Sequence, residues 1–77
     1  YGYYGLLYAG DDKDELNKGL KIIDLVVPYY FNEQMQLERA KAYLKLGNTE
    51  TGQKLLKELI NKNLLVDEAT KLLSKSQ

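Results

Sequence analysis

The stretch that decides the fold runs from Ala40 to Leu59, AKAYLKLGNTETGQKLLKEL, in which two apolar patterns of helical period meet at Gly47-Asn48. Apolar residues recur every three or four positions before the glycine, and the same spacing resumes shortly after it. Glycine readily takes the left-handed conformation that ends many helices, and asparagine is a frequent cap of the next helix. A link this short brings the second helix back beside the first, so the stretch predicts an αα-hairpin.

The helical period continues in both directions from this hairpin, and the alternation typical of strands is nearly absent. An apolar stripe begins after Asp12, whose side chain can cap a helix, and ends at Pro28, which cannot continue one. The segment before Gly10, YGYYGLLYA, has the character of the end of a first helix. We therefore predict a single all-α domain, residues 1–77, of about five helices: a first hairpin at about 1–27, a second at about 32–62 and a terminal helix at about 66–76.

The apolar positions of each helix define the predicted core, because residues three and four apart share one helical face. The sets, in chain order, are Leu16, Leu20, Ile23 and Val27; Leu37, Ala40, Tyr43, Leu44 and Leu46; Gly52, Leu55, Leu56, Leu59 and Ile60; and Ala69, Leu72 and Leu73.

Length and composition restrict the classes of function. A chain of 77 residues buries only about 60% of its unfolded surface, so its own core is marginal. It opens on Tyr1 and not on Met, and we expect a piece of a larger protein. Without cysteine or histidine, thiolate chemistry and the commonest proton shuttle are missing. No apolar run reaches the roughly 18 residues typical of a membrane span, so we expect a soluble chain without a membrane partner. The sequence does not decide the cellular compartment of the chain, although the cytoplasm is slightly favoured.

The charges are unevenly distributed although the net charge is zero. Three lysines against seven acids give residues 1–38 a net charge of −4, and eight basic residues against four acids give residues 39–77 a net charge of +4. Such a dipolar chain can stack head to tail, and mixed charge is also typical of a solvated helical surface. The basic half lacks interleaved aromatic residues, so no nucleic-acid partner is expected.

Motifs for catalysis are missing from the sequence. The spacing Asp12-x-Asp14 is that of the start of a calcium loop, but Leu16 occupies the next ligand position and no glycine follows in register. Acids in the first turn of a helix, which its dipole favours, explain this cluster better. Ser74 and Ser76 are the only serines, and no glycine-rich phosphate loop is present. We predict no catalytic residue, no cofactor and no metal site, and thus no enzyme.

The residues around Gly47 resemble a tetratricopeptide repeat, a helix-turn-helix unit of about 34 residues. The segment AKAYLKLGN, at 40–48, is similar to the end of the first helix of such a repeat, and Gly52, Leu56 and Leu59 match positions of its second helix. A second glycine turn, at Gly10, lies 37 residues before the first.

The resemblance covers most of the chain but depends chiefly on residues 35–60. Gln36 and Arg39 stand where the family favours apolar side chains, no proline follows the fourth helix, and the 37-residue spacing exceeds the usual period.

The resemblance implies hairpins stacked as a short right-handed superhelix, whose first helices line a concave groove for a peptide or a partner helix. The function that it implies is a protein–protein interaction or scaffolding module. Lys41 and Lys45 are four residues apart and can hold a carboxylate between them, or are simply solvated. The groove residues implied by the resemblance are Tyr4, Tyr8, Gln34, Leu37, Lys41, Leu44 and Lys45.

Two other hypotheses for the function stay open: a purely structural segment of a longer helical protein, and the effector-sensing helical part of a bacterial regulator.

The seven tyrosines and Phe31 are many aromatic residues for so short a chain. Tyrosine suits interfaces as well as cores. We expect Tyr30 and Tyr43 in the core. For the tyrosines near the N-terminus, both a position in the core and a position in an interface stay open, and self-association through that tyrosine-rich helix is an alternative.

Overall fold

The computed structural model describes residues 10–76, so the predicted first helix, with Tyr4 and Tyr8, lies outside the described residues. Between residues 10 and 76 the chain is all-helical and contains no strand, as predicted. Of the roughly five helices expected, four fall within this range. The superhelical stacking implied by the tetratricopeptide resemblance stays a prediction. The helices are α2 (Lys13–Val26), α3 (Glu33–Lys45), α4 (Thr49–Asn61) and α5 (Val66–Ser76).

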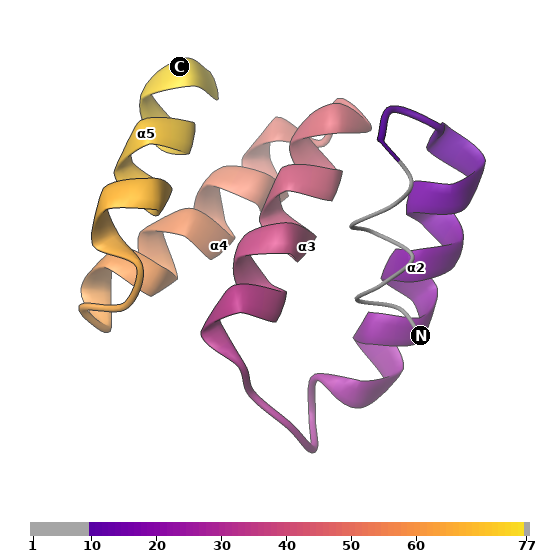
Figure 1. Cartoon of the computed structure of the whole chain (residues 1–77), viewed down its shortest axis with the longest axis horizontal. Coiled ribbons are helices and arrows are strands. Elements are labelled where there is room, and N and C mark those ends of the chain that lie inside the picture. The colour runs from indigo at the N-terminus through magenta and orange to yellow at the C-terminus, as the bar shows by residue number, and fades with distance from the viewer. Residues whose placement is uncertain (1–9, 77) are drawn as a thin grey trace.

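Consecutive helices run in opposite directions, and α3 lies at the centre with α2 on one side and α4 and α5 on the other (Figure 1). The most extensive contact is between α3 and α4, the hairpin around Gly47, and α5 packs on both of these helices. Among the four described helices, α2 contacts α3 alone. The described part of the chain is therefore a three-helix unit with one further helix beside α3.

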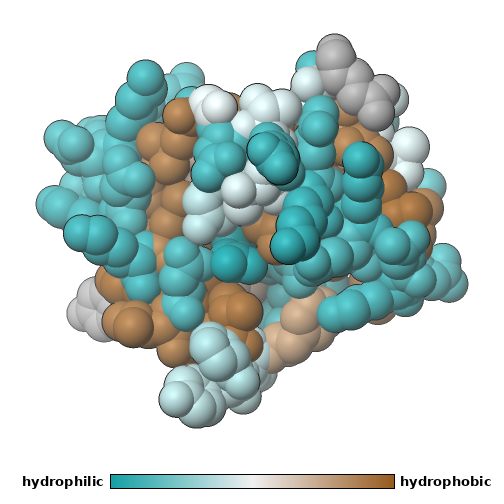
Figure 2. Space-filling view, turned by 180° about the vertical axis from the view of Figure 1, so that it is seen from behind, coloured by the Kyte–Doolittle hydropathy of each residue, from teal (hydrophilic) through white to brown (hydrophobic). Residues whose placement is uncertain are grey.

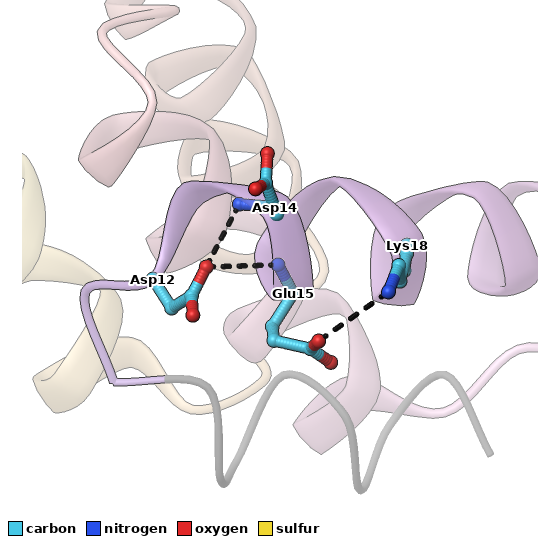
Figure 3. A network of polar contacts seen from close by, with 4 residues as sticks. All are labelled: Asp12, Asp14, Glu15 and Lys18. Carbon is cyan, nitrogen blue, oxygen red and sulfur yellow. Dashed lines mark hydrogen bonds and ion pairs between the residues drawn. The ribbon is translucent and has the colours of Figure 1, made fainter.

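The acidic cluster at the start of α2 caps the helix (Figure 3). One carboxylate oxygen of Asp12 accepts hydrogen bonds from the backbone amides of Asp14, at 3.0 Å, and Glu15, at 3.3 Å. The Glu15 carboxylate lies 3.5 Å from Lys18 Nζ one turn further on. These contacts satisfy amides that have no partner within the helix, which is the structural role predicted for the cluster.

The starts of α3 and α4 are also capped, that of α4 by the asparagine expected from the sequence. The side chain of Asn32 accepts a hydrogen bond from the Met35 amide at 3.0 Å, and that of Asn48 accepts one from the Thr51 amide at 3.4 Å. Between α3 and α4, Gly47 has a φ of +87°, in the left-handed region that a side chain makes costly. This one glycine lets the chain reverse within three residues.

The larger core cluster lies between α3, α4 and α5. Its buried members come from all three helices, and Leu56 and Leu59 are completely enclosed. The predicted positions are confirmed, although Leu44, Ile60, Leu72 and Leu73 are only half-buried at its margin. The buried residues are Leu37, Ala40, Leu55, Leu56, Leu59 and Ala69.

Gly52 sets the distance between α3 and α4. A Cβ at this position would lie 2.7 Å from Cδ2 of Leu44 and 3.2 Å from the carbonyl oxygen of Ala40. A larger residue would force the Leu44 side chain to move and would crowd the Ala40 carbonyl, which is why a glycine suits this position.

The smaller cluster joins α2 to α3. It consists of Leu16, Leu20 and Ile23 from α2 and Ala42 from α3. Tyr43 is half-buried and packs against both clusters, so it connects the two parts of the core.

Gln36 is a polar residue in the core, at a position where the tetratricopeptide family favours apolar side chains. Its Nε2 donates a hydrogen bond to the carbonyl oxygen of Leu55 at 2.9 Å and a longer one to Glu58 at 3.4 Å. A buried amide with such partners does not carry the cost of an unpaired polar group. The side chain therefore cross-links α3 to α4.

Candidate functional site

The groove residues predicted on α3 do not form one open surface. Leu37 is only 3% exposed and belongs to the larger core cluster, so its side chain faces α4 and α5 and not a groove. Leu44 is half-buried against Gly52. Gln34 is exposed near the start of α3, where it lines a pocket with Tyr30.

The two lysines predicted to share a carboxylate each have a partner within the chain. Lys41 Nζ lies 3.2 Å from the carboxylate of Glu38, one turn earlier in α3. Lys45 donates a hydrogen bond to the carbonyl oxygen of Gly10 at 2.8 Å and lies 3.8 Å from a carboxylate oxygen of Asp11. The two lysines thus contact different segments of the chain. The i, i+3 spacing of Glu38 and Lys41 could have indicated their ion pair from the sequence.

A surface that the sequence analysis did not single out lies where α2 ends. Six large apolar side chains between residues 22 and 31 are exposed; Leu25 is 75% exposed and Tyr29 is 89% exposed. In Figure 2 apolar side chains reach the surface on the side of α2, bordered by polar residues. We call this surface the 22–31 patch: Ile22, Leu25, Val26, Tyr29, Tyr30 and Phe31.

Three of the patch residues lie on α2 with helical spacing. Ile22, Leu25 and Val26 stand at i, i+3 and i+4 and form a second apolar stripe on α2 beside the one that packs on α3, and Tyr29 follows in the turn after the helix ends. This spacing was a signal that the sequence analysis missed. Tyr30, predicted to lie in the core, is 55% exposed, so that prediction is wrong. The reason is that Val27 and Met35, on either side of it in the sequence, pack against the smaller cluster and Tyr30 does not.

A pocket of about 330 Å³ adjoins the 22–31 patch and shares Tyr30 with it. Its other lining residues are Asn32, Gln34 and Met35, so the pocket combines two large apolar side chains with two amides. Mostly apolar walls with a few polar groups are typical of pockets that bind a small molecule or a side chain.

Phe31, at the far end of the patch, is held by the three-helix unit. Lys62 Nζ, just after α4, lies 4.4 Å from the centre of the Phe31 ring. An ammonium at this distance from an aromatic face is attracted by the ring quadrupole. The connection between α2 and α3 is therefore attached to α4 as well as to its two neighbouring helices.

A polar junction holds α2 on α3 behind the patch. The two carboxylate oxygens of Asp24 accept hydrogen bonds from Arg39 Nε, at 2.8 Å, and from the Tyr43 hydroxyl, at 3.1 Å. The Arg39 guanidinium also lies 5.8 Å from the centre of the Tyr43 ring. Burial raises the pKa of Tyr43 above its ordinary value of 10.0, and the hydrogen bond and charge of Asp24 raise it further, while Arg39 opposes the change. These groups are all mutually paired, so we assign the junction a structural role.

Residues 10–76 contain no cluster of three or more histidine, cysteine, aspartate or glutamate side chains placed to hold a metal ion. Within the same part of the chain, no helix combines the length and the hydropathy needed to cross a membrane.

Comparison of the chain with protein-family models, with curated proteins and with solved structures gave no match. Arguments about function therefore depend on the geometry of the chain itself, and the strongest feature of that geometry is the 22–31 patch with its pocket.

Proposed function

We propose that the chain is a protein–protein interaction or scaffolding module that binds a protein partner on the 22–31 patch. The single observation that carries this proposal is the exposure of six large apolar side chains within ten consecutive residues. Isolated apolar residues are common on protein surfaces, but contiguous apolar patches usually mark binding sites.

The composition of the patch supports a protein partner. Tyrosine and phenylalanine are enriched at the centres of protein interfaces, where a ring buries a large area with little loss of conformational entropy. Tyr29, Tyr30 and Phe31 are consecutive and all exposed. The stripe of Ile22, Leu25 and Val26 on α2 has the spacing with which one amphipathic helix packs on another.

The three-helix unit is suited to the role of a rigid support. The close contact at Gly52, the Gln36 hydrogen bond and the tetratricopeptide-like hairpin around Gly47 make α3 and α4 a stable base. Under this proposal the partner contacts the end of α2 and not the concave face implied by the resemblance, because Leu37 is enclosed there and both lysines are paired.

The proposal is tested by NMR on the full labelled chain. Synthetic amphipathic helical peptides with a leucine stripe and either acidic or basic flanks are titrated, and backbone amide shifts are followed residue by residue. We expect saturable shifts that cluster on residues 22–35. Leu25→Ser should weaken binding by about tenfold or more, because Leu25 is central and its exposure makes the change harmless to the fold.

Lys54→Ser is the matched control, since Lys54 is exposed on α4 away from the patch and should leave binding unchanged. Saturable shifts confined to Gln34, Lys41, Leu44 and Lys45 would instead support the original groove and overturn the patch as the site. If no peptide gives saturable shifts, the chain is better explained as a structural segment of a longer helical protein.

A further inference from the structure

We propose that the partner of the 22–31 patch is a second copy of this chain, bound by a two-fold contact in which Tyr29 of each copy enters the pocket beside Tyr30 of the other. This inference rests on the proposed function, because it names the partner of the same surface. Size, chemistry, symmetry and charge each support it.

The first argument is the match in size between Tyr29 and the pocket. Tyr29 is the most exposed large apolar side chain of the described residues, at 89%. The pocket has a volume of about 330 Å³. An apolar cavity of about 150 Å³ is enough to hold a benzene ring. The pocket therefore has room for the phenol ring of a tyrosine.

The second argument is chemical. A tyrosine side chain has an apolar ring and a hydroxyl that needs a hydrogen-bond partner when it is buried. In the pocket, Tyr30 and Met35 provide apolar contacts for the ring. The side-chain amides of Asn32 and Gln34 provide hydrogen-bond partners for the hydroxyl. Both kinds of group are thus present where Tyr29 of a second copy would need them.

The third argument concerns symmetry. Tyr29 and Tyr30 are adjacent in the sequence, yet the Tyr29 side chain lies in solvent and leaves the pocket of its own chain open. A protruding side chain and its complementary pocket on one surface are what a two-fold contact requires, since residue i of one copy meets residue j of the other and the reverse. One such contact fills both pockets.

The fourth argument is charge complementarity. Lys21 on α2 directly precedes the patch in the sequence and Glu33, at the start of α3, follows it; both are exposed. A two-fold axis through the patch reverses the direction of the second copy, so the basic border of each copy faces the acidic border of the other. The net charge of zero adds no long-range repulsion between copies.

The inference is tested by sedimentation equilibrium of the full chain at concentrations from about 1 μM to 1 mM, a range that covers weak and transient interfaces. We expect the average mass to rise from that of one chain toward that of two. Tyr29→Ser should raise the dissociation constant by about tenfold or more, and Tyr29→Phe by only about threefold, because phenylalanine keeps the ring and loses the hydroxyl. Lys54→Ser should behave like the unchanged chain.

A chain that stays monomeric up to 1 mM overturns the inference, and so does association that Tyr29→Ser leaves unchanged, which would point to the N-terminal tyrosines instead. The peptide titration separates this failure from failure of the proposed function. If the chain stays monomeric but its residues 22–35 bind amphipathic peptides, the proposed function holds with a different partner. If the chain neither associates with itself nor binds the peptides, both proposals are wrong.

Discussion

The three-helix unit of α3, α4 and α5 and the edge helix α2 are stabilised in different ways. The unit encloses six residues in one apolar cluster, brings two helices close together at Gly52 and satisfies its one buried amide. The edge helix contributes three buried side chains, contacts only α3 among the described helices and depends on the partly exposed Asp24 for its polar contacts. The unit is a core in its own right, and α2 is attached to it.

This difference explains where the exposed apolar surface lies. Each helix of the three-helix unit contacts the two others, and none of the large apolar side chains in these three helices is exposed in the way that those of the 22–31 patch are. The edge helix has one described neighbour and carries two apolar stripes, so one stripe remains on the surface. Segments with few buried contacts open more easily, and binding surfaces are often drawn from them.

The largest expected effect comes from removing an enclosed leucine from each region. Leu56→Ala should lower the free energy of unfolding by about 3 kcal/mol, because a fully buried leucine is lost and a cavity is left. Leu16→Ala makes the same change at an equally buried site of the smaller cluster. It should accelerate amide hydrogen exchange in α2 while α4 and α5 keep their protection. Urea unfolding and exchange measured by NMR check both expectations. Equal acceleration of exchange in all four helices by Leu16→Ala would show that the two regions open as one unit.

A smaller effect is expected at the polar junction. Asp24→Ala removes the hydrogen bonds to Arg39 and Tyr43 and should cost about 1 kcal/mol, since the carboxylate is partly exposed and solvent screens it. Thermal unfolding and exchange of the α2 amides measure the change. Lys18→Ala is the control, because it removes an exposed contact within one helix and should cost less than about 0.5 kcal/mol. Equal losses in the two variants would mean that the junction adds nothing to the attachment of α2.

The smallest effect is a dependence on pH. The pKa of Tyr43 is raised in the folded chain, so above pH 10.0 the unfolded chain loses this proton before the folded chain does. The stability that the protonated hydroxyl contributes is complete below pH 10.0 and declines as the pH rises toward and through the folded pKa. Urea unfolding at several pH values between 9 and 11 should show a steeper loss for the unchanged chain than for Tyr43→Phe, which has no proton to lose. If the free energy of unfolding falls equally steeply with pH in both chains, Tyr43 is not the cause of the loss.

The helices could be predicted from the sequence because their signals are local. The caps Asp12, Asn32 and Asn48, the break at Pro28 and the left-handed Gly47 each act on residues within one turn, and the structure confirms all of them. The close helix contact at Gly52 could also be predicted from the sequence, because glycine is unfavourable inside an amphipathic helix unless another helix packs closely against it.

The candidate site could not be predicted in the same way. Leu37 was assigned to an open groove, but whether an apolar residue of α3 faces solvent depends on where α4 and α5 pack. The stripe of Ile22, Leu25 and Val26 has helical spacing in the sequence, yet a helix with two apolar stripes does not reveal which one will be covered.

The sequence by itself determined the elements of this protein: where each helix begins and ends, and which of its residues are apolar enough to be buried. Those properties follow from interactions between residues a few positions apart. Only the tertiary structure decided which apolar face of α2 was left exposed, that the Gln36 amide would be satisfied by Leu55, and that Tyr30 would line a pocket instead of the core. The physical reason is that burial depends on neighbours distant in the sequence, and among the described helices α3 alone packs on α2 and covers one of its faces.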